Sequence, residues 1–281
     1  MFPDLGTKYI YIREIGNGGT GVVNLAVDTH TGFQVAVKSL FKSHFENNPA
    51  MVKRFKIEAN IYLMLSHPNI VKLKDLILKD GAHLVMDYVE GMTLEEYIRT
   101  VTGPIPSEVA MAIIKEIAAA IGYAHKKQIP IPGYNGVLHL DIKPSNILIS
   151  NSGKIKVIDY GISQGSKEDR MDQIVGSLMY MAPEQLQLES TLDHRTDIYA
   201  LGVLLHQMLT GTTPYSSKDS KDEIKRKIQN EPLERLITIY PHVDNRLQKI
   251  IDTATSKNSD NRFKNCEAFI NSLEEINHAT N

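Results

Sequence analysis

Residues 139–146 read His-Leu-Asp-Ile-Lys-Pro-Ser-Asn, and this stretch decides how the rest of the chain is interpreted. It places a carboxylate, a cation and an amide close together, from Asp141 to Asn146. Asp141 can accept or orient the proton of an attacking hydroxyl group. Lys143 can neutralise negative charge on a group in transfer, and Asn146 can bind a metal ion through its carbonyl oxygen. A lone aspartate in a loop would indicate nothing, whereas the complete string is specific.

A second candidate metal ligand follows this stretch. Residues 159–161 read Asp-Tyr-Gly, directly after a short apolar segment, residues 155–158, that we expect to be a strand. Magnesium prefers hard oxygen ligands and usually takes one or two carboxylates together with phosphates of a substrate. Asp159 is therefore the predicted main magnesium ligand. An ordinary turn after a strand is the alternative interpretation.

A glycine-rich segment lies near the start of the chain, where Gly16, Gly18 and Gly21 fit the pattern GxGxxG. Two different folds use this pattern. In a dinucleotide-binding unit the glycines open a helix, but here residues 22–27 follow them and alternate like a strand. This context argues against a nicotinamide-dependent enzyme and favours a hairpin over phosphate groups, because backbone amides approach phosphate oxygens where no Cβ intervenes. A flexible hairpin turn is the alternative.

A lysine ends the next apolar segment, since residues 35–38 read Val-Ala-Val-Lys. Such a lysine is usually an edge or surface residue, and the functional interpretation is that Lys38 contacts phosphates. A buried ammonium group needs a counter-charge. Glu58 is the natural partner, because it lies in the helix predicted over residues 48–65. Glu46 is the rival, in a polar stretch before that helix.

Predicted elements divide the chain at about residue 86. Before it, alternating or β-branched apolar residues predict strands, with one main helix among them. These strands cover residues 9–16, 21–28, 33–40, 70–78 and 83–88. Beyond it the pattern is mostly helical, including a long helix with Ser107 as its expected N-cap. We therefore expect an α+β fold with a sheet-rich lobe, residues 1–86, and a helical lobe, residues 87–281.

Composition restricts the classes of protein that remain. Of the 281 residues, 42% are hydrophobic and 23% charged, which is ordinary globular usage. The formal net charge of −2 gives no global attraction to nucleic acid or an anionic membrane. One cysteine, Cys266, allows no internal disulfide and fits a cytosolic chain. No apolar run approaches the ~18 residues of a membrane span. We expect no nucleic-acid partner, no membrane insertion within this chain and a cytoplasmic location.

Further motifs complete a series along the chain: Ala-Pro-Glu at residues 182–184, an aspartate at Asp197, and Asp-Asn-Arg-Phe at residues 260–263. In this order the motifs resemble the eukaryotic-like (Hanks-type) protein kinase family, and they are most similar to bacterial serine/threonine protein kinase domains. The resemblance covers about residues 9–273. It implies one protein kinase domain over residues 1–281, with a bilobal fold: a small N-terminal antiparallel sheet lobe carrying one main helix, and a larger, mostly helical C-terminal lobe.

The resemblance also implies an activity and its cofactors. ATP and Mg²⁺ would be bound, and the γ-phosphate would pass to serine or threonine hydroxyls of protein substrates. Asp141 would be the catalytic base, with Lys143 at the transferred group. Asn146 and Asp159 would hold the metal, and Ser177 would help to position Asp141 and the substrate. Lys143 followed by Pro144 is the serine/threonine pattern, because tyrosine kinases usually have Ala or Arg at that place.

The same resemblance assigns the nucleotide contacts. The ion pair of Lys38 and Glu58 would position the phosphates of ATP. The other expected contacts are the loop glycines Gly16, Gly18 and Gly21, the adenine neighbours Val23, Ala36 and Leu148, the gatekeeper Met86, and backbone groups of Asp87 and Val89. Glu184 and Arg262 match a structural ion pair. Asp197 matches the aspartate that braces the catalytic loop.

The chain departs from the family pattern at several places. Leu140 stands where the family usually has an arginine, which normally pairs with a phosphate on the activation loop. We therefore hypothesise that the active shape does not need activation-loop phosphorylation. Tyr160 replaces the usual Phe, and Tyr199 a frequent Trp. Residues 128–136 lengthen the connection to the catalytic loop, as either a docking surface or an inert insertion.

A nucleotide-binding pseudokinase or scaffold is the alternative to an active enzyme. Such a protein would hold nucleotide or a partner without chemistry. The feature that separates the two readings is the completeness of the catalytic set, Lys38, Glu58, Asp141, Asn146 and Asp159, all of which are present. The complete set favours the active kinase.

Overall fold

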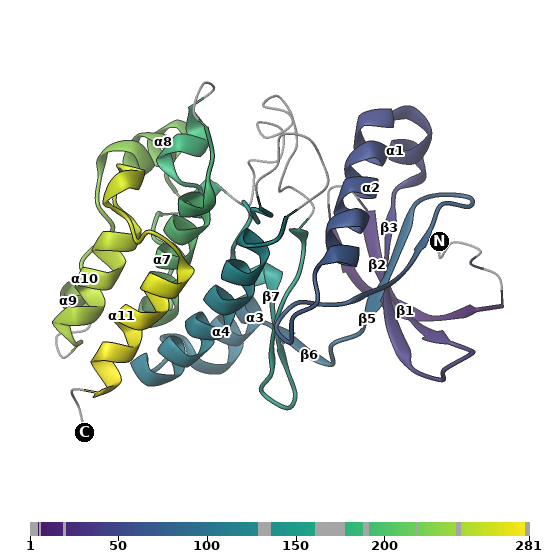
Figure 1. The fold of residues 1–281 in the computed structure, drawn as a ribbon, viewed down its shortest axis with the longest axis horizontal. Helices are drawn as coiled ribbons and strands as arrows, with labels where there is room; N and C mark the ends of the chain where they lie inside the picture. Colours follow the sequence, from purple (N-terminus) through teal and green to yellow (C-terminus); the bar gives the residue numbers. More distant parts are fainter. Residues whose placement is uncertain are drawn as a thin grey trace. The chain divides into compact units, whose positions relative to one another are not determined.

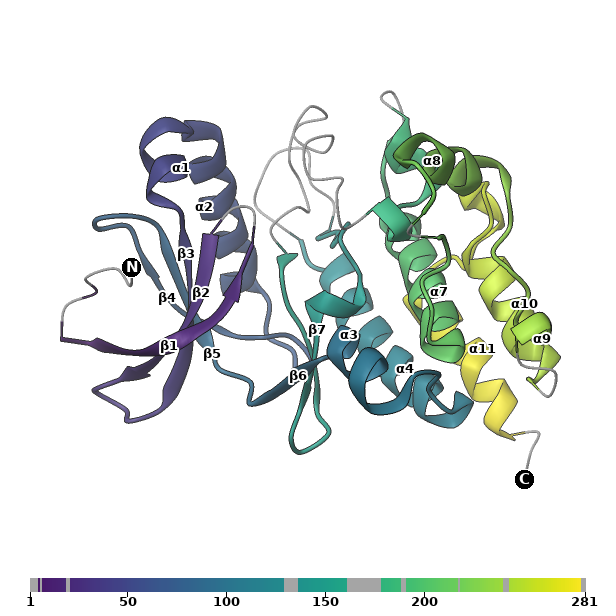
Figure 2. The ribbon, with the colours of Figure 1, turned by 180° about the vertical axis from the view of Figure 1, so that it is seen from behind.

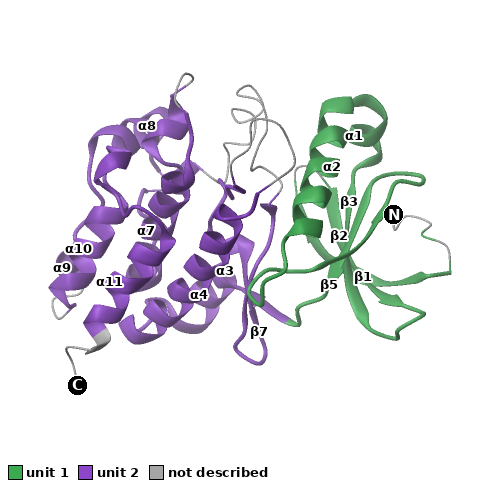
Figure 3. Cartoon of the chain, viewed as in Figure 1, with its two compact units in different colours: residues 1–90 green, residues 91–281 purple. Residues whose placement is uncertain are grey.

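The structure is a computed structural model of the chain, and it describes residues 5, 7–18, 21–128, 136–160, 178–187, 191–216, 218–239 and 243–278. The chain forms two compact units (Figure 3). Unit 1 comprises residues 1–90 and unit 2 residues 91–281. Within the described part of the chain, no helix combines the length and the hydropathy needed to cross a membrane.

Unit 1 is built on an antiparallel sheet of five strands in the order β1-β2-β3-β5-β4 (Figure 1). The strands are β1 (Tyr9–Asn17), β2 (Gly21–Asp28), β3 (Gln34–Leu40), β4 (Leu73–Ile77) and β5 (His83–Asp87). One face of the sheet carries an apolar core of five buried residues, Tyr9, Ala26, Val35, Val37 and Val85. β-Branched residues dominate this core, as expected for strands that pack on a pleated surface.

The strand register brings the candidate nucleotide contacts to the other face of the sheet. Val23 pairs with Lys38, and Lys38 pairs with Leu84 on the next strand. Ala36 pairs with Met86 in the neighbouring row. Directly paired residues point to the same face, and residues two apart along a strand do so as well. Val23, Ala36, Lys38 and Met86 therefore share one face.

Two helices complete unit 1. The short helix α1 (Lys42–Asn47) precedes α2 (Pro49–Met64). Asn48 caps α2, because its side chain accepts a hydrogen bond from the Met51 N–H at 3.0 Å. A proline at the first helical position adds to this start signal. α2 matches the predicted main helix, whereas α1 lies in a stretch for which we expected no helix.

Unit 2 is mostly helical (Figure 2). Its helices are α3 (Leu94–Tyr97), α4 (Ser107–His125), α7 (His194–Thr210), α8 (Lys221–Asn230), α9 (Leu236–Ile239), α10 (Asn245–Ala254) and α11 (Cys266–His278), and a π-helical turn, η1 (Ile98–Thr102), follows α3. It also contains an antiparallel sheet of three strands, in the order β6-β7-β8. These strands are β6 (Gly91–Thr93), β7 (Ile147–Ser150) and β8 (Ile155–Val157).

Helix α7 forms the centre of unit 2. Every residue from Thr196 to Thr210 is buried, and α4 and α10 pack against this helix. A helix that is buried on all sides belongs to the core of its domain. α11 in turn packs against α4 and α10.

The start of α4 differs from the prediction. Ser107 is the first helical residue, and Pro106 occupies the cap position with φ −52° and ψ 139°. No side chain caps this end of the helix. The reason is that the extended conformation of Pro106 already turns the chain into the helix, so Ser107 takes helical dihedrals instead of the extended ones that a capping serine needs.

Candidate active site

Asp141 lies in the loop that precedes the 3₁₀ turn η2 (Pro144–Asn146). Its Oδ2 accepts hydrogen bonds from Lys143 Nζ at 2.8 Å and from Asn146 Nδ2 at 2.9 Å. Its Oδ1 is also buried, and among the described residues no donor lies within hydrogen-bond distance of that oxygen. The carboxylate is thus oriented through its Oδ2, and within the described residues its Oδ1 accepts no hydrogen bond.

Asp197 holds the backbone of this loop from the N-terminal part of α7. Its carboxylate accepts hydrogen bonds from the backbone N–H groups of His139 and Leu140, both at 2.8 Å. It also lies 2.7 Å from His125 Nε2, at the end of α4. The carboxylate is completely buried. Burial alone would raise the pKa of Asp197, but the hydrogen bond and charge of His125 and the contacts of His139 outweigh it and hold that pKa below its ordinary value.

Replacing Asp197 tests how much its contacts with His125 and the loop backbone stabilise the fold. In Asp197→Asn, an amide NH₂ replaces one acceptor and faces a donor, so we expect the free energy of unfolding at pH 7 to fall by about 3 kcal/mol. A carboxylate whose pKa is depressed by folding stabilises the fold above its ordinary pKa of about 3.9. That contribution is lost as the pH falls through the lower, folded-state value. The difference between variant and wild type should therefore shrink below about pH 4.

Denaturant unfolding between pH 3 and pH 8 measures this effect. Asp222→Asn is the matched control, because the Asp222 side chain is 94% exposed on α8. A difference for Asp197→Asn that is absent at pH 7, or that grows toward acid pH, would contradict the assignment.

Asn146 and Asp159 are the candidate metal ligands, and the backbone brings them together. The Ile158 N–H donates to the Asn146 carbonyl at 3.0 Å, and Asp159 is the next residue. Asn146 Nδ2 donates to the carbonyl and to Oδ2 of Asp141, so the side-chain oxygen of Asn146 is directed away from Asp141. In the described part of the chain, no group of three or more His, Cys, Asp or Glu side chains is arranged so that it could hold a metal ion. Two oxygen ligands fit Mg²⁺, which keeps waters and binds substrate phosphates.

Lys38 and Glu58 form an ion pair within unit 1. The distance from Lys38 Nζ to Glu58 Oε1 is 2.8 Å, and the two side chains are 18% and 6% exposed. The rival carboxylate of Glu46 instead lies 3.7 Å from Lys42, where both side chains are exposed. The partner predicted from the sequence is therefore the one observed.

The glycine-rich segment forms the turn from β1 to β2. The Gly18 N–H donates to the Gly21 carbonyl at 3.0 Å, and Gly16 pairs with Val23. A Cβ on Gly21 would lie 2.0 Å from the carbonyl oxygen of Ser39, so this position requires glycine. A Cβ on Gly18 would meet no atom within 4 Å, so packing does not explain the glycine there. Residues 19 and 20 lie outside the described part of the chain.

Other candidates occupy the ends of strands. The Asp87 N–H, at the end of β5, donates to the Lys72 carbonyl at 3.0 Å. Val89 follows β5 and is partly buried, and Leu148 lies in β7 of unit 2. Ser177 lies outside the described residues, as do residues 129–135 of the lengthened connection.

Glu184 and Arg262 form the predicted structural ion pair. Two parallel bonds join them, at 2.6 and 2.8 Å, which is the strongest geometry for such a pair. The Arg262 guanidinium also lies 5.0 Å from the ring centre of Tyr199, so this tyrosine supplies the aromatic face. Tyr160 is buried against the ring of His139, with the ring centres 4.6 Å apart.

Sequence reasoning missed two residues of this site, His125 and Gln185. His125 is 72 residues from Asp197 in the chain, and Gln185 contacts Leu140 across 45 residues. Neither residue belongs to a motif that indicates function in the sequence. Only the packing of α4, α7 and the turn η5 (Pro183–Leu186) reveals them.

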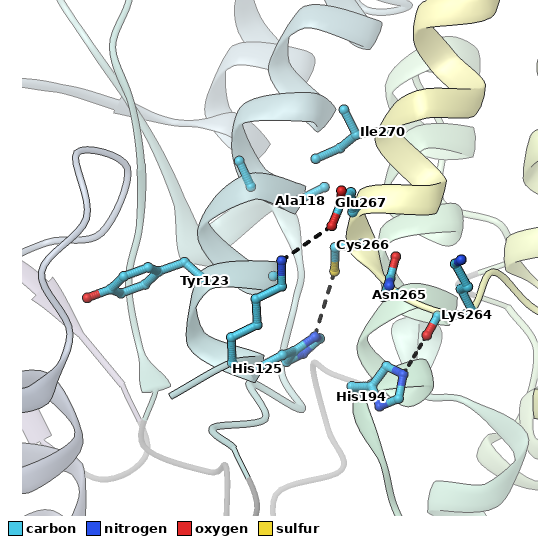
Figure 4. Close-up of a pocket in the computed structure, with 12 residues that line it drawn as sticks. Ala118, Tyr123, His125, His194, Lys264, Asn265, Cys266, Glu267 and Ile270 are labelled. Carbon is cyan, nitrogen blue, oxygen red and sulfur yellow. Dashed lines mark hydrogen bonds and ion pairs between the residues drawn. The ribbon is translucent and has the colours of Figure 1, made fainter. Parts of the chain in front are cut away.

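A pocket of about 600 Å³ lies beside this brace, between the last turns of α4 and the start of α11 (Figure 4). His125 lines it, with its Nδ1 3.7 Å from Cys266 Sγ. Lys126 and Glu267 form an ion pair of 3.3 Å there. Burial raises the pKa of the Cys266 thiol and keeps it protonated. Cys266 therefore packs against the His125 ring as a small, unreactive side chain.

Unit 1 combines a sheet with the Lys38–Glu58 ion pair, and unit 2 combines helices with an oriented Asp141 and with Asn146 and Asp159 as candidate metal ligands. These features together are those of a protein kinase. The family model "Protein kinase domain" matches residues 9–275, and the chain belongs to this family.

Curated relatives and solved structures agree with the family. The chain is 36% identical over 264 residues to the probable serine/threonine-protein kinase PknB of Lactococcus lactis, covering 92% of this chain and 40% of the relative. It is 37% identical over 265 residues to the serine/threonine-protein kinase PrkC of Bacillus subtilis, covering 92% and 39%. The chain thus spans about 40% of the length of these relatives. The crystal structure of the Mycobacterium tuberculosis PknI kinase domain matches with a TM-score of 0.73 and 25% identity, over 97% of this chain and 96% of that one.

Proposed function

We propose that this chain is an active serine/threonine protein kinase domain, which transfers the γ-phosphate of ATP to serine or threonine hydroxyls of protein substrates. The observation that carries the proposal is Asp141, whose Oδ2 is held by Lys143 and Asn146 while its buried Oδ1 has no donor among the described residues. The names of the relatives PknB and PrkC support serine/threonine specificity.

Asp141 would orient the substrate hydroxyl and accept its proton at Oδ1. Lys143 stays 2.8 Å from Oδ2 and would neutralise charge that develops on the transferred group. Ser177 would help to position Asp141 and the substrate. Phosphoryl transfer leaves little covalent chemistry to the protein, so these residues would act by positioning and charge stabilisation.

Unit 1 would supply most of the nucleotide contacts. Lys38, held by Glu58, would contact the α- and β-phosphates, with the backbone of Gly16, Gly18 and Gly21 over them. The adenine contacts would be Val23, Ala36, Leu148, the gatekeeper Met86, and backbone groups of Asp87 and Val89. Since the Asp87 N–H already donates a hydrogen bond to the Lys72 carbonyl, we assign the Asp87 carbonyl to adenine. When bound, Mg²⁺ on Asn146 and Asp159 would neutralise phosphate charge.

We further propose that residues 1–281 form one kinase domain, with the two units as its lobes, acting on protein substrates in the cytoplasm. The near-neutral composition and the single cysteine support this environment. Transfer of labelled γ-phosphate to a basic acceptor protein tests the activity. Stabilisation by ATP without transfer would instead support a nucleotide-binding pseudokinase.

Independence from activation-loop phosphorylation is part of the proposal, because Leu140 removes the arginine that would bind the phosphate. Between residues 161 and 182 the hydroxyl side chains are Ser163, Ser166, Ser177 and Tyr180. We expect the double variant Ser163→Ala, Ser166→Ala to retain kcat within about twofold of wild type, since no arginine pair is lost. Initial rates of phosphate transfer measure this. A large loss of activity in the double variant would contradict independence from activation-loop phosphorylation.

A further inference from the structure

Leu140, the residue before Asp141, has an unusual backbone conformation. Its φ is 61°, in the left-handed region. This conformation costs a residue with a Cβ roughly 1–2 kcal/mol, and it persists only where the surroundings determine it. Asp197 holds the Leu140 N–H, as described above. The Leu140 carbonyl is held separately, by the side chain of Gln185, whose Nε2 lies 3.3 Å away.

The orientation of the Gln185 amide follows from its second contact. Gln185 Oε1 accepts the Ala182 N–H at 2.8 Å. Because a backbone N–H can only donate, the amide oxygen faces Ala182 and the NH₂ group faces the Leu140 carbonyl. The side chain therefore joins the start of turn η5 to the catalytic loop through one planar group.

Turn η5 is itself firmly anchored. The neighbouring Glu184 forms the two-bond pair with Arg262 and accepts the Thr196 hydroxyl at 2.9 Å. Thr196 precedes Asp197 in α7. Gln185 and Asp197 thus bind the carbonyl and the N–H of Leu140 from η5 and α7 of the same unit.

We propose that Gln185 is a positioning residue for Asp141. By holding the Leu140 carbonyl, it maintains the strained backbone from which the Asp141 carboxylate projects. It does so without phosphate, in a chain that has no arginine at position 140. The inference rests on the proposed kinase activity for its catalytic consequence, while the contact itself concerns only the catalytic loop.

The variant Gln185→Glu is the most informative test. One carboxyl oxygen can still accept the Ala182 N–H, but an ionised carboxylate turns a second oxygen toward the Leu140 carbonyl. We expect kcat at pH 8 to fall roughly tenfold, because small displacements of a catalytic group are costly, while KM for ATP is unchanged. The facing carbonyl raises the pKa of the introduced carboxyl, since it favours the protonated form. The ratio of variant to wild-type kcat should therefore rise as the pH falls from 8 to 5.5.

Two further variants and one further measurement complete the test. Gln187→Glu places the same charge on the exposed side chain two residues on and should match wild type at every pH. Gln185→Ala should lower kcat with no recovery at low pH. Amide hydrogen exchange at residues 139–141 should quicken in both Gln185 variants, relative to wild type and Gln187→Glu, whether or not the chain transfers phosphate.

Each outcome decides one claim. Faster exchange together with the pH-dependent recovery supports the positioning role. Unchanged exchange, or an active wild type with a pH-independent kcat ratio for Gln185→Glu, overturns it. An inactive wild type contradicts the proposed function, and the exchange result then still decides whether Gln185 holds the loop.

Discussion

We expect Asp141→Asn to reduce phosphate transfer by about two to four orders of magnitude and to leave ATP binding intact. Asparagine keeps the shape of the side chain and one oxygen. It removes the negative charge that pairs with Lys143 at 2.8 Å, and an amide at the buried Oδ1 position cannot accept a proton. The loss should appear in kcat, because in the proposed mechanism Asp141 contacts the reacting hydroxyl and this interaction would strengthen in the transition state.

Initial rates with labelled ATP measure the transfer, and a thermal shift with ATP and magnesium measures binding. Asp222→Asn is the control, since it makes the same chemical change on an exposed side chain of α8. Transfer by Asp141→Asn within a few-fold of wild type would remove Asp141 from the catalytic role.

We expect Lys38→Met to lower transfer by orders of magnitude as well, through a different effect. The variant loses the cation assigned to the phosphates, and it removes the cation 2.8 Å from the nearly buried Glu58 carboxylate. Removing one member of a buried ion pair destabilises the fold, here by about 3 kcal/mol. Nucleotide binding should weaken together with transfer, whereas Asp141→Asn affects transfer alone.

A second variant separates the two consequences. Lys38→Met combined with Glu58→Gln removes both charges, so the melting temperature should recover while transfer stays low. Lys42→Met is the control, because its side chain is 83% exposed and its pair with Glu46 is long. Recovery of transfer in the double variant would mean that Lys38 acts only on stability.

The strands and the main helix of unit 1 could be predicted from sequence because their signals are local. β1, β2, β3 and β5 follow alternation and turn residues, and α2 follows apolar spacing with a capping asparagine and proline. Glu58 was preferred over Glu46 because only Glu58 lies within that helical pattern, and the observed ion pair has the same partner.

What could not be predicted depends on contacts distant in the chain. The hydrogen bond between His125 and Asp197 forms only because α4 and α7 pack against each other. The hydrogen bond from Gln185 to the Leu140 carbonyl forms only because the turn after Ala182 contacts the loop that contains Asp141. Neither contact leaves a periodic signal. The predicted N-cap of α4 is wrong for a local reason. Both Pro106 and Ser107 are residues that favour the start of a helix, and only the dihedral angles show that Pro106 is the cap.

Phosphate transfer by the wild-type chain, followed by identification of the modified residue, tests the central claim most directly. The purified protein is incubated with γ-labelled ATP, magnesium and a basic acceptor protein, beside Asp141→Asn. We expect label on serine or threonine of the acceptor with wild type, and almost none with the variant. Stabilisation by ATP without any label, or equal label with both proteins, would contradict it.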